Sequence, residues 1–159
     1  MKKRYSTIIL FLSISLAYAQ NMTQEDLQLL EGQWTGDLVY LDYSSNKEVK
    51  IPVEVSIEKV KEGKFKFNYV YPKEPKANST STVIIDLDKE KIAGENIEKV
   101  QLIDNLWTIV AYSSGKDNGQ KARFIKTYII GGTSLSIKKE VQYESSDERF
   151  MRNEYRLKK

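Results

Sequence analysis

Apolar and polar residues alternate along most of the chain, and an alternation with period two is typical of β-strands that bury one face. The clearest example is residues 48–58, in which polar residues alternate with Val49, Ile51, Val53, Val55 and Ile57. Further runs of this kind lie at 64–71, 81–87, 97–103, 105–113, 121–130, 133–144 and 148–157. Together with a first strand that opens at Gly32, the pattern predicts nine β runs in an all-β protein.

The connections between these runs are short, and several consist of turn-forming residues, such as 114–120 and 131–132. Parallel neighbours would need long crossover segments, so sequential antiparallel pairing is expected. Closing such a meander removes its unpaired edges, and all-antiparallel closure needs an even number of strands. We therefore predict an up-and-down barrel of about 8–10 strands, with 91–96 as the candidate for a tenth. A β-sandwich is the alternative, but its returns usually need longer connections than most of these.

A polar segment with two spaced leucines precedes the first strand. Residues 23–30 predict a short N-terminal helix, because Thr23 can cap it and Asp26 suits its first turn. Leu27 and Leu30 would then form its apolar edge. After this segment the pattern is β to the end of the chain.

The first nineteen residues have the parts of a secretory signal peptide. Three cations at 2–4 precede an apolar stretch that is too short to span a bilayer, and Ala17-Tyr18-Ala19 presents small residues where a signal peptidase reads them. We therefore expect residues 1–19 to be removed, which leaves one domain at 20–159. This predicts a periplasmic or secreted protein without a stable membrane anchor.

The composition excludes several classes of function. Three of the 25 lysines and arginines lie in the signal, so the mature domain balances 22 cations against 22 acids and gives no reason to expect a nucleic-acid partner. The chain has neither cysteine nor histidine. Their absence removes disulfides, thiolate nucleophiles, Ser-His-Asp triads and the commonest metal ligand. We predict no metal site, no cofactor and no catalytic residue.

The pattern Leu30-x-Gly32-x-Trp34-x-Gly36 opens the first strand directly after the short helix. It resembles the Gly-x-Trp signature of the lipocalin-like (calycin) superfamily. The resemblance implies a small secreted barrel that binds apolar molecules in a central calyx. It also implies that Trp34, with Gly32 and Gly36 beside it, belongs to the closed end of the barrel, where an arginine from the last strand packs across the indole.

The last strand offers two arginines for that position. It should return antiparallel to the first strand, so Arg156 is expected nearest Trp34, with Arg152 second. A guanidinium over an indole is worth roughly 0.5–2 kcal/mol. The more apolar side of this strand is the opposite one, however, which would turn both arginines outward. Because Glu154 stands two residues after Arg152, the strand also lacks the Arg-x-Tyr carboxylate clamp of the intracellular fatty-acid-binding relatives, which argues against a fatty acid as ligand.

Aromatic side chains supply the best candidates for a ligand pocket. Tyr40, Tyr69 and Trp107 could line the interior and offer stacking surface together with a hydrogen-bond donor. Most of the other aromatic residues are expected to fill the core, since aromatics favour strands in any case.

Arg123 is a further candidate whose role depends on the orientation of its strand. If the face that carries Arg123 and Ile125 points inward, the arginine is a buried cation that could bind a ligand carboxylate. If Phe124, Tyr128 and Ile130 point inward instead, Arg123 is an ordinary surface residue. The second orientation is the favoured one, because arginine is rarely buried.

Three functions are consistent with the sequence. The resemblance favours a carrier of a small apolar or amphipathic molecule. The alternatives are a protein–protein interaction or inhibitor module that uses the barrel loops, and an enzyme that uses the cavity. A continuous cavity would favour the first, a filled barrel with one exposed apolar patch the second, and a cluster of buried acids the third.

Overall fold

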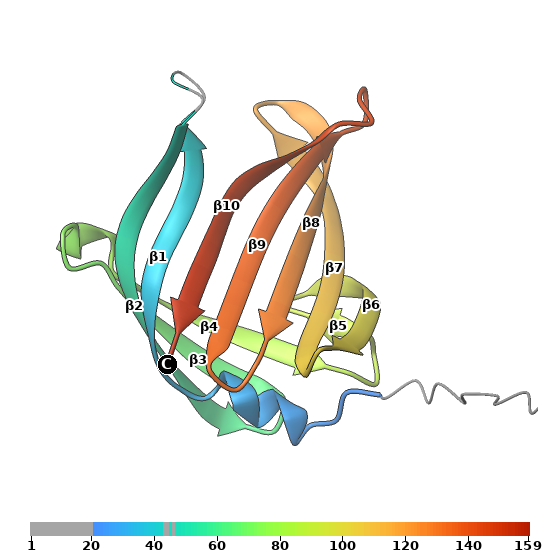
Figure 1. The fold of residues 1–159 in the computed structure, drawn as a ribbon. Helices are drawn as coiled ribbons and strands as arrows, with labels where there is room; N and C mark the ends of the chain where they lie inside the picture. Colours follow the sequence, from blue (N-terminus) through green and yellow to red (C-terminus); the bar gives the residue numbers. More distant parts are fainter. Residues whose placement is uncertain (1–20, 43–44, 46) are drawn as a thin grey trace, which may run out of the picture.

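Ten β-strands follow one another in the computed structural model, which describes residues 21–42, 45 and 47–159 (Figure 1). They are β1 (Gly32–Asp42), β2 (Lys47–Lys61), β3 (Lys64–Val70), β4 (Ser79–Asp86), β5 (Lys91–Ile92), β6 (Glu95–Ile103), β7 (Leu106–Asp117), β8 (Gln120–Ile130), β9 (Ser134–Tyr143) and β10 (Arg149–Lys158). Two 3-10 helices accompany them, η1 (Asp26–Leu30) before β1 and η2 (Pro75–Ala77) between β3 and β4.

The strands form one closed antiparallel barrel. Each strand pairs with the next along the chain, and β10 pairs with β1. This closing seam runs from Thr35 opposite Lys158 to Tyr40 opposite Asn153, and Figure 1 shows the two strands side by side. The predicted all-β antiparallel meander barrel is thus confirmed, with ten strands. The tenth strand is β5, a two-residue element inside the 91–96 segment that the sequence indicated.

The inward face of the barrel follows the alternation seen in the sequence. Pairing places Trp34 of β1 opposite Val55 of β2, and Val55 opposite Tyr69 of β3. Most of the apolar side chains on this face are almost fully buried, and each contributes about 1.5–3 kcal/mol relative to exposure. The fully buried side chains of the core include Trp34, Phe65, Phe67, Leu27, Leu30, Ile57, Ile85, Ile92, Ile109, Ile130 and Leu135.

One end of the barrel is closed by the segment that precedes β1. Figure 1 shows η1 beneath the strands at this end, and its Leu27 and Leu30 are 0% and 2% exposed within the core. The Asp26 carboxylate accepts hydrogen bonds from the backbone N and the Oγ1 of Thr23, both at 2.7 Å. In place of the short helix expected over 23–30, the structure has a 3-10 turn at Asp26–Leu30, whose Leu27 and Leu30 are buried.

The signal peptide predicted over residues 1–19 lies outside the described residues. In the part of the chain that is described, no helix is long and apolar enough to cross a membrane. Nor do those residues include a group of three or more acidic, histidine or cysteine side chains that could hold a metal ion.

Candidate functional site

A cavity of about 380 Å³ lies inside the barrel, between β3 and β4 on one wall and β8, β9 and β10 on the other. This volume falls within the range of small-molecule sites, about 300–1,000 Å³. Its lining combines aromatic, aliphatic and cationic side chains, and no carboxylate is among the described residues that form it. The lining residues are Phe67, Tyr69, Ser81, Thr82, Val83, Ala93, Lys126, Tyr128, Ile137, Lys139, Asn153 and Tyr155.

Tyrosines form the aromatic part of this lining. The rings of Tyr69 and Tyr155 lie 5.2 Å apart between centroids, and those of Tyr69 and Phe67 lie 6.2 Å apart. The hydroxyl of Tyr155 is 2.9 Å from that of Tyr71. Burial raises the pKa of Tyr69 to about 12, and it also raises the pKa values of Tyr128 and Tyr155. These phenols therefore stay neutral at physiological pH and present apolar faces with polar edges.

Two lysines form the polar part. Lys126 of β8 and Lys139 of β9 are cross-strand partners, and Lys139 in turn is opposite Asn153 of β10. Cross-strand partners project to the same face of a sheet, with Cβ atoms about 4.5–5.5 Å apart. All three side chains line the cavity. The barrel thus carries two lysines and one asparagine at neighbouring positions of its inner face.

One carboxylate accompanies this pair. The Nζ of Lys126 is 3.1 Å from Oε1 of Glu95, and the hydroxyl of Ser113 donates to the same oxygen at 3.2 Å. The side chains of Lys126 and Glu95 are 27% and 12% exposed. Oε2 of Glu95 is buried without a hydrogen-bond partner among the described atoms. Lys139 instead contacts an aromatic ring, with its Nζ 4.5 Å from the centroid of Phe124.

Of the predicted pocket residues, the structure brings only Tyr69 to the cavity. Tyr40 lies on the inward face of β1 but is not among the lining residues, and Trp107 is 2% exposed within the core. Arg123 lies on the outer face, where its Nη2 is 2.9 Å from Glu98 and its guanidinium is 4.6 Å from the Tyr112 ring centroid. The favoured orientation of β8 is therefore the observed one.

Trp34 lies at the closed end of the barrel and is 1% exposed. Its indole Nε1 donates to the backbone oxygen of Leu30 at 2.8 Å. The cation that lies over the indole is Lys159, with its Nζ 4.5 Å from the ring centroid, and the same ammonium group donates to the backbone oxygen of Leu29 at 3.1 Å. Gly32, with a φ of 125°, lets the chain turn into β1 beneath this lysine.

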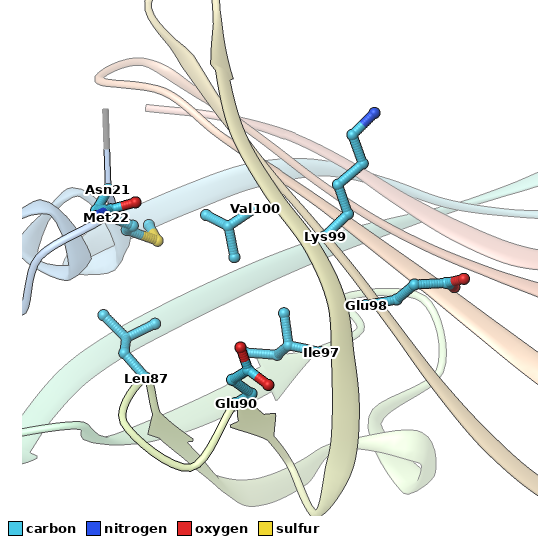
Figure 2. A pocket seen from close by; sticks show the side chains of 8 residues that line it. All are labelled: Asn21, Met22, Leu87, Glu90, Ile97, Glu98, Lys99 and Val100. Atoms are coloured by element: carbon cyan, nitrogen blue, oxygen red, sulfur yellow. The ribbon is translucent and has the colours of Figure 1, made fainter. Parts of the chain in front are cut away.

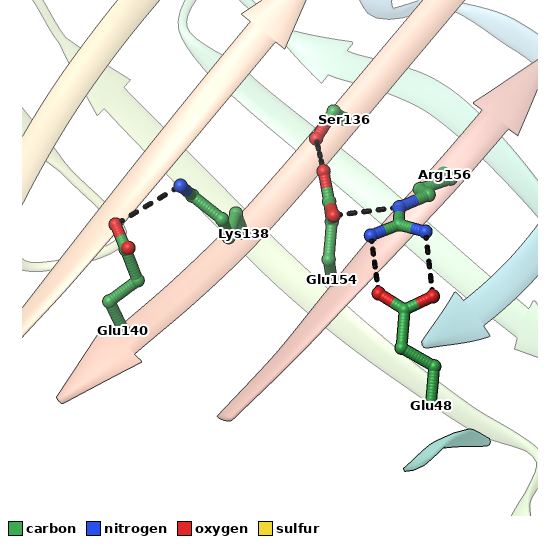
Figure 3. A network of polar contacts seen from close by, with 6 residues as sticks. All are labelled: Glu48, Ser136, Lys138, Glu140, Glu154 and Arg156. Atoms are coloured by element: carbon green, nitrogen blue, oxygen red, sulfur yellow. Dashed lines mark hydrogen bonds and ion pairs between the residues drawn. The ribbon is translucent and has the colours of Figure 1, made fainter. Parts of the chain in front are cut away.

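The two arginines expected over Trp34 lie elsewhere, and the structure corrects that expectation. Arg156 is on the outer face of β10, where its Nε is 2.7 Å from Glu154 and its Nη2 is 3.2 Å from Glu48 of β2 (Figure 3). Arg152 binds the carboxylate of Asp117 and lies over the Phe150 ring. For Arg156 the physical reason is parity, since β10 turns Tyr155 and Leu157 inward, whereas Arg152 stands at the register shift between Met151 and Asn153.

Reasoning from the sequence missed Lys126 and Lys139 of the cavity, although the alternation of apolar and polar residues contains a sign of both. Lys126 stands between Phe124 and Tyr128 on the face that the sequence favours as inward. Lys139 likewise shares its face with Ile137 and Val141. A lysine on the apolar face of a strand is unusual, because charged side chains are rarely buried without a partner. That observation alone could have identified both positions.

A second hollow, of about 250 Å³, lies between the N-terminal segment and β6. Figure 2 shows Met22, Leu87, Ile97 and Val100 around it, whereas the side chain of Lys99 points away. Asn21 and Glu90 add polar groups to its lining, but its volume is below the range of about 300–1,000 Å³ that is usual for small-molecule sites. The barrel cavity is therefore the better candidate site.

No protein-family model matches the chain, and no curated protein sequence matches it either.

Proposed function

We propose that this protein is an exported lipocalin-like barrel that binds a small amphipathic molecule in its central cavity. The observation that carries the proposal is a cavity of about 380 Å³ with tyrosines on one part of its wall and lysines on another. Phe67, Tyr69 and Ile137 offer the apolar surface that would hold the body of a ligand. The polar groups would fix its orientation.

Two further features support this function over the alternatives. The Gly-x-Trp pattern stands at the start of β1 with its tryptophan buried, which agrees with the resemblance to the calycin superfamily. A cavity inside the barrel also favours a ligand-binding role over a protein-interaction module, which would not need one. Export is supported by the signal-peptide character of residues 1–19, and the function would then lie in the periplasm or outside the cell.

The test is a titration with N-phenyl-1-naphthylamine, a neutral dye that fluoresces in apolar surroundings. Wild-type protein should bind the dye at one site. Ser81→Trp would place a large ring in the cavity from β4, and it should weaken dye binding at least tenfold. Thr80→Trp is the matched control, because Thr80 is the neighbour on the other face of the same strand, and its dye binding should match the wild type.

Two results would overturn the proposal. One is the absence of dye binding to the folded wild-type protein. The other is equal binding by wild type and Ser81→Trp, since the dye would then occupy a surface outside the barrel.

A further inference from the structure

We infer that the molecule bound in this cavity carries a negatively charged group, such as a carboxylate or a sulfonate, and that Lys139 is its principal anchor. This inference rests on the proposed function, because it describes the ligand of the same cavity. It is carried by the juxtaposition of Lys126 and Lys139 inside the barrel.

Facing lysines are an unfavourable arrangement unless something stabilises them. Lys126 and Lys139 are direct cross-strand partners on the inner face of β8 and β9. Like charges directly opposite one another in a sheet destabilise it. Both groups also lose part of their contact with water, which adds a desolvation cost to the repulsion. A stable barrel that keeps two ammonium groups here therefore provides a site for negative charge.

The protein supplies only part of that negative charge. Glu95 pairs with Lys126 at 3.1 Å, which balances one of the two cations. In the described part of the chain, no carboxylate lies within ion-pair distance of Lys139, whose Nζ lies over the Phe124 ring instead. The cavity therefore has an excess of one positive charge, and Lys139 carries it.

Asp117, the last residue of β7, is an acidic group that Lys139 influences, and it is already engaged. The carboxylate of Asp117 accepts hydrogen bonds from the Tyr143 hydroxyl, at 2.7 Å, and from Arg152. These bonds, together with the cations of Arg152 and Lys139, hold the pKa of Asp117 below its ordinary value. Asp117 is thus committed to its own partners and leaves Lys139 available to an incoming anion.

The surroundings of Lys139 suit an anionic head group on an apolar body. Asn153 lies opposite Lys139 on the neighbouring strand and can donate its amide hydrogens to the same anion. Ile137, two residues before Lys139 on the same face, and the ring of Tyr155 continue the lining as apolar surface. A hydrogen bond between an ammonium group and an anion is stronger than one between neutral groups, so the charged end should decide the orientation of the ligand.

Two dyes that differ by one charged group test this inference. The compound 8-anilinonaphthalene-1-sulfonate has the same aromatic skeleton as N-phenyl-1-naphthylamine and adds a sulfonate. Wild-type protein should bind the sulfonated dye more tightly than the neutral one. Lys139→Gln should weaken binding of the sulfonated dye about tenfold or more, which corresponds to the net strength of a charged hydrogen bond. It should leave binding of the neutral dye unchanged.

Matched variants separate the site from the general charge of the protein. Lys138→Gln removes a cation from the adjacent position on the outer face of β9, where Lys138 pairs with Glu140, and it should leave both dyes unaffected. Glu95→Gln should strengthen binding of the sulfonated dye, because it frees Lys126. Glu98→Gln, on the outer face, is its control.

The outcomes distinguish this inference from the proposed function. If neither dye binds, the proposed function fails. If the neutral dye binds in the cavity but Lys139→Gln leaves the affinity for the sulfonated dye intact, the anion site is refuted and the proposed function stands. If Lys139→Gln weakens both dyes equally, the lysine supports the shape of the cavity and the anion site is again refuted.

Discussion

Replacing Trp34 by alanine should be one of the most costly single changes in this domain. The indole is 1% exposed, and a buried aromatic side chain removes about 150–250 Å² from water, which at about 25 cal/mol per Å² amounts to roughly 4–6 kcal/mol. The change also leaves the Leu30 carbonyl without the indole donor. Large-to-small substitutions of this kind usually cost about 3–5 kcal/mol. We expect a loss of that size in the free energy of unfolding measured with urea.

A double-mutant cycle tests which cation contacts the indole. We expect Trp34→Leu and Lys159→Ala to be coupled by about 0.5–1 kcal/mol, because the ammonium group lies 4.5 Å from the ring centroid. Leucine is used in the cycle because it removes the aromatic face while keeping most of the packing. Arg156→Ala serves as the control, since its guanidinium binds Glu48 and Glu154 on the outer face. Its effect should add to that of Trp34→Leu.

Two results would refute this reasoning. A cost below about 2 kcal/mol for Trp34→Ala would mean that the closed end does not depend on the indole, in conflict with the usual cost of such a change. Coupling of Trp34 to Arg156 but not to Lys159 would mean that the arginine expected from the family resemblance occupies the position after all.

Two more perturbations test the barrel seam and the buried tyrosines. Gly36→Ala would place a Cβ against the backbone oxygen of Arg156 across the seam between β1 and β10, so we expect the free energy of unfolding to fall by about 1–3 kcal/mol. Gly132→Ala is the control and should be nearly neutral, because no atom lies within 4 Å of the added Cβ. Equal costs for the two changes would refute this argument. Because burial raises the pKa of Tyr69 from 10.0 to about 12, the folded state holds this proton more tightly than the unfolded state. The resulting stability is complete below about pH 10 and is lost as the pH rises toward 12. The free energy of unfolding should therefore fall less steeply with pH over this window in Tyr69→Phe than in wild type. Identical slopes in the two proteins would contradict this.

The fold could be predicted because its signals are local. Alternation within each run identifies a strand and its buried face, and short connections leave antiparallel pairing as the only economical arrangement. Even β5, with only Lys91 and Ile92, was indicated by the need for an even number of strands. What the alternation does not define is the register at irregular positions. The pairing of β9 with β10 shifts between Met151 and Asn153, and Arg152 stands at that shift.

The identity of the cation over Trp34 could not be predicted for a related reason. The expectation of Arg156 rests on the family resemblance and on the antiparallel return of the last strand, and neither specifies the position of a side chain to better than a residue or two. The direction of a side chain changes with every residue along a strand. Lys159 follows the last residue of β10 and is free of that alternation, so it can fold across the indole.

The distribution of stability along the barrel explains why a cationic cavity can persist. The closed end combines Trp34 with Leu27 and Leu30, all nearly fully buried, and each such side chain contributes about 1.5–3 kcal/mol or more. The repulsion between two facing lysines costs about 0.2–1 kcal/mol on the scale of cross-strand pairs, and Glu95 offsets part of it. The packed end therefore tolerates an unfavourable pair in the cavity without loss of the fold. Leucine or threonine at 126 and 139 would fill the barrel without this repulsion, and the proposed anion site would account for lysines at both positions.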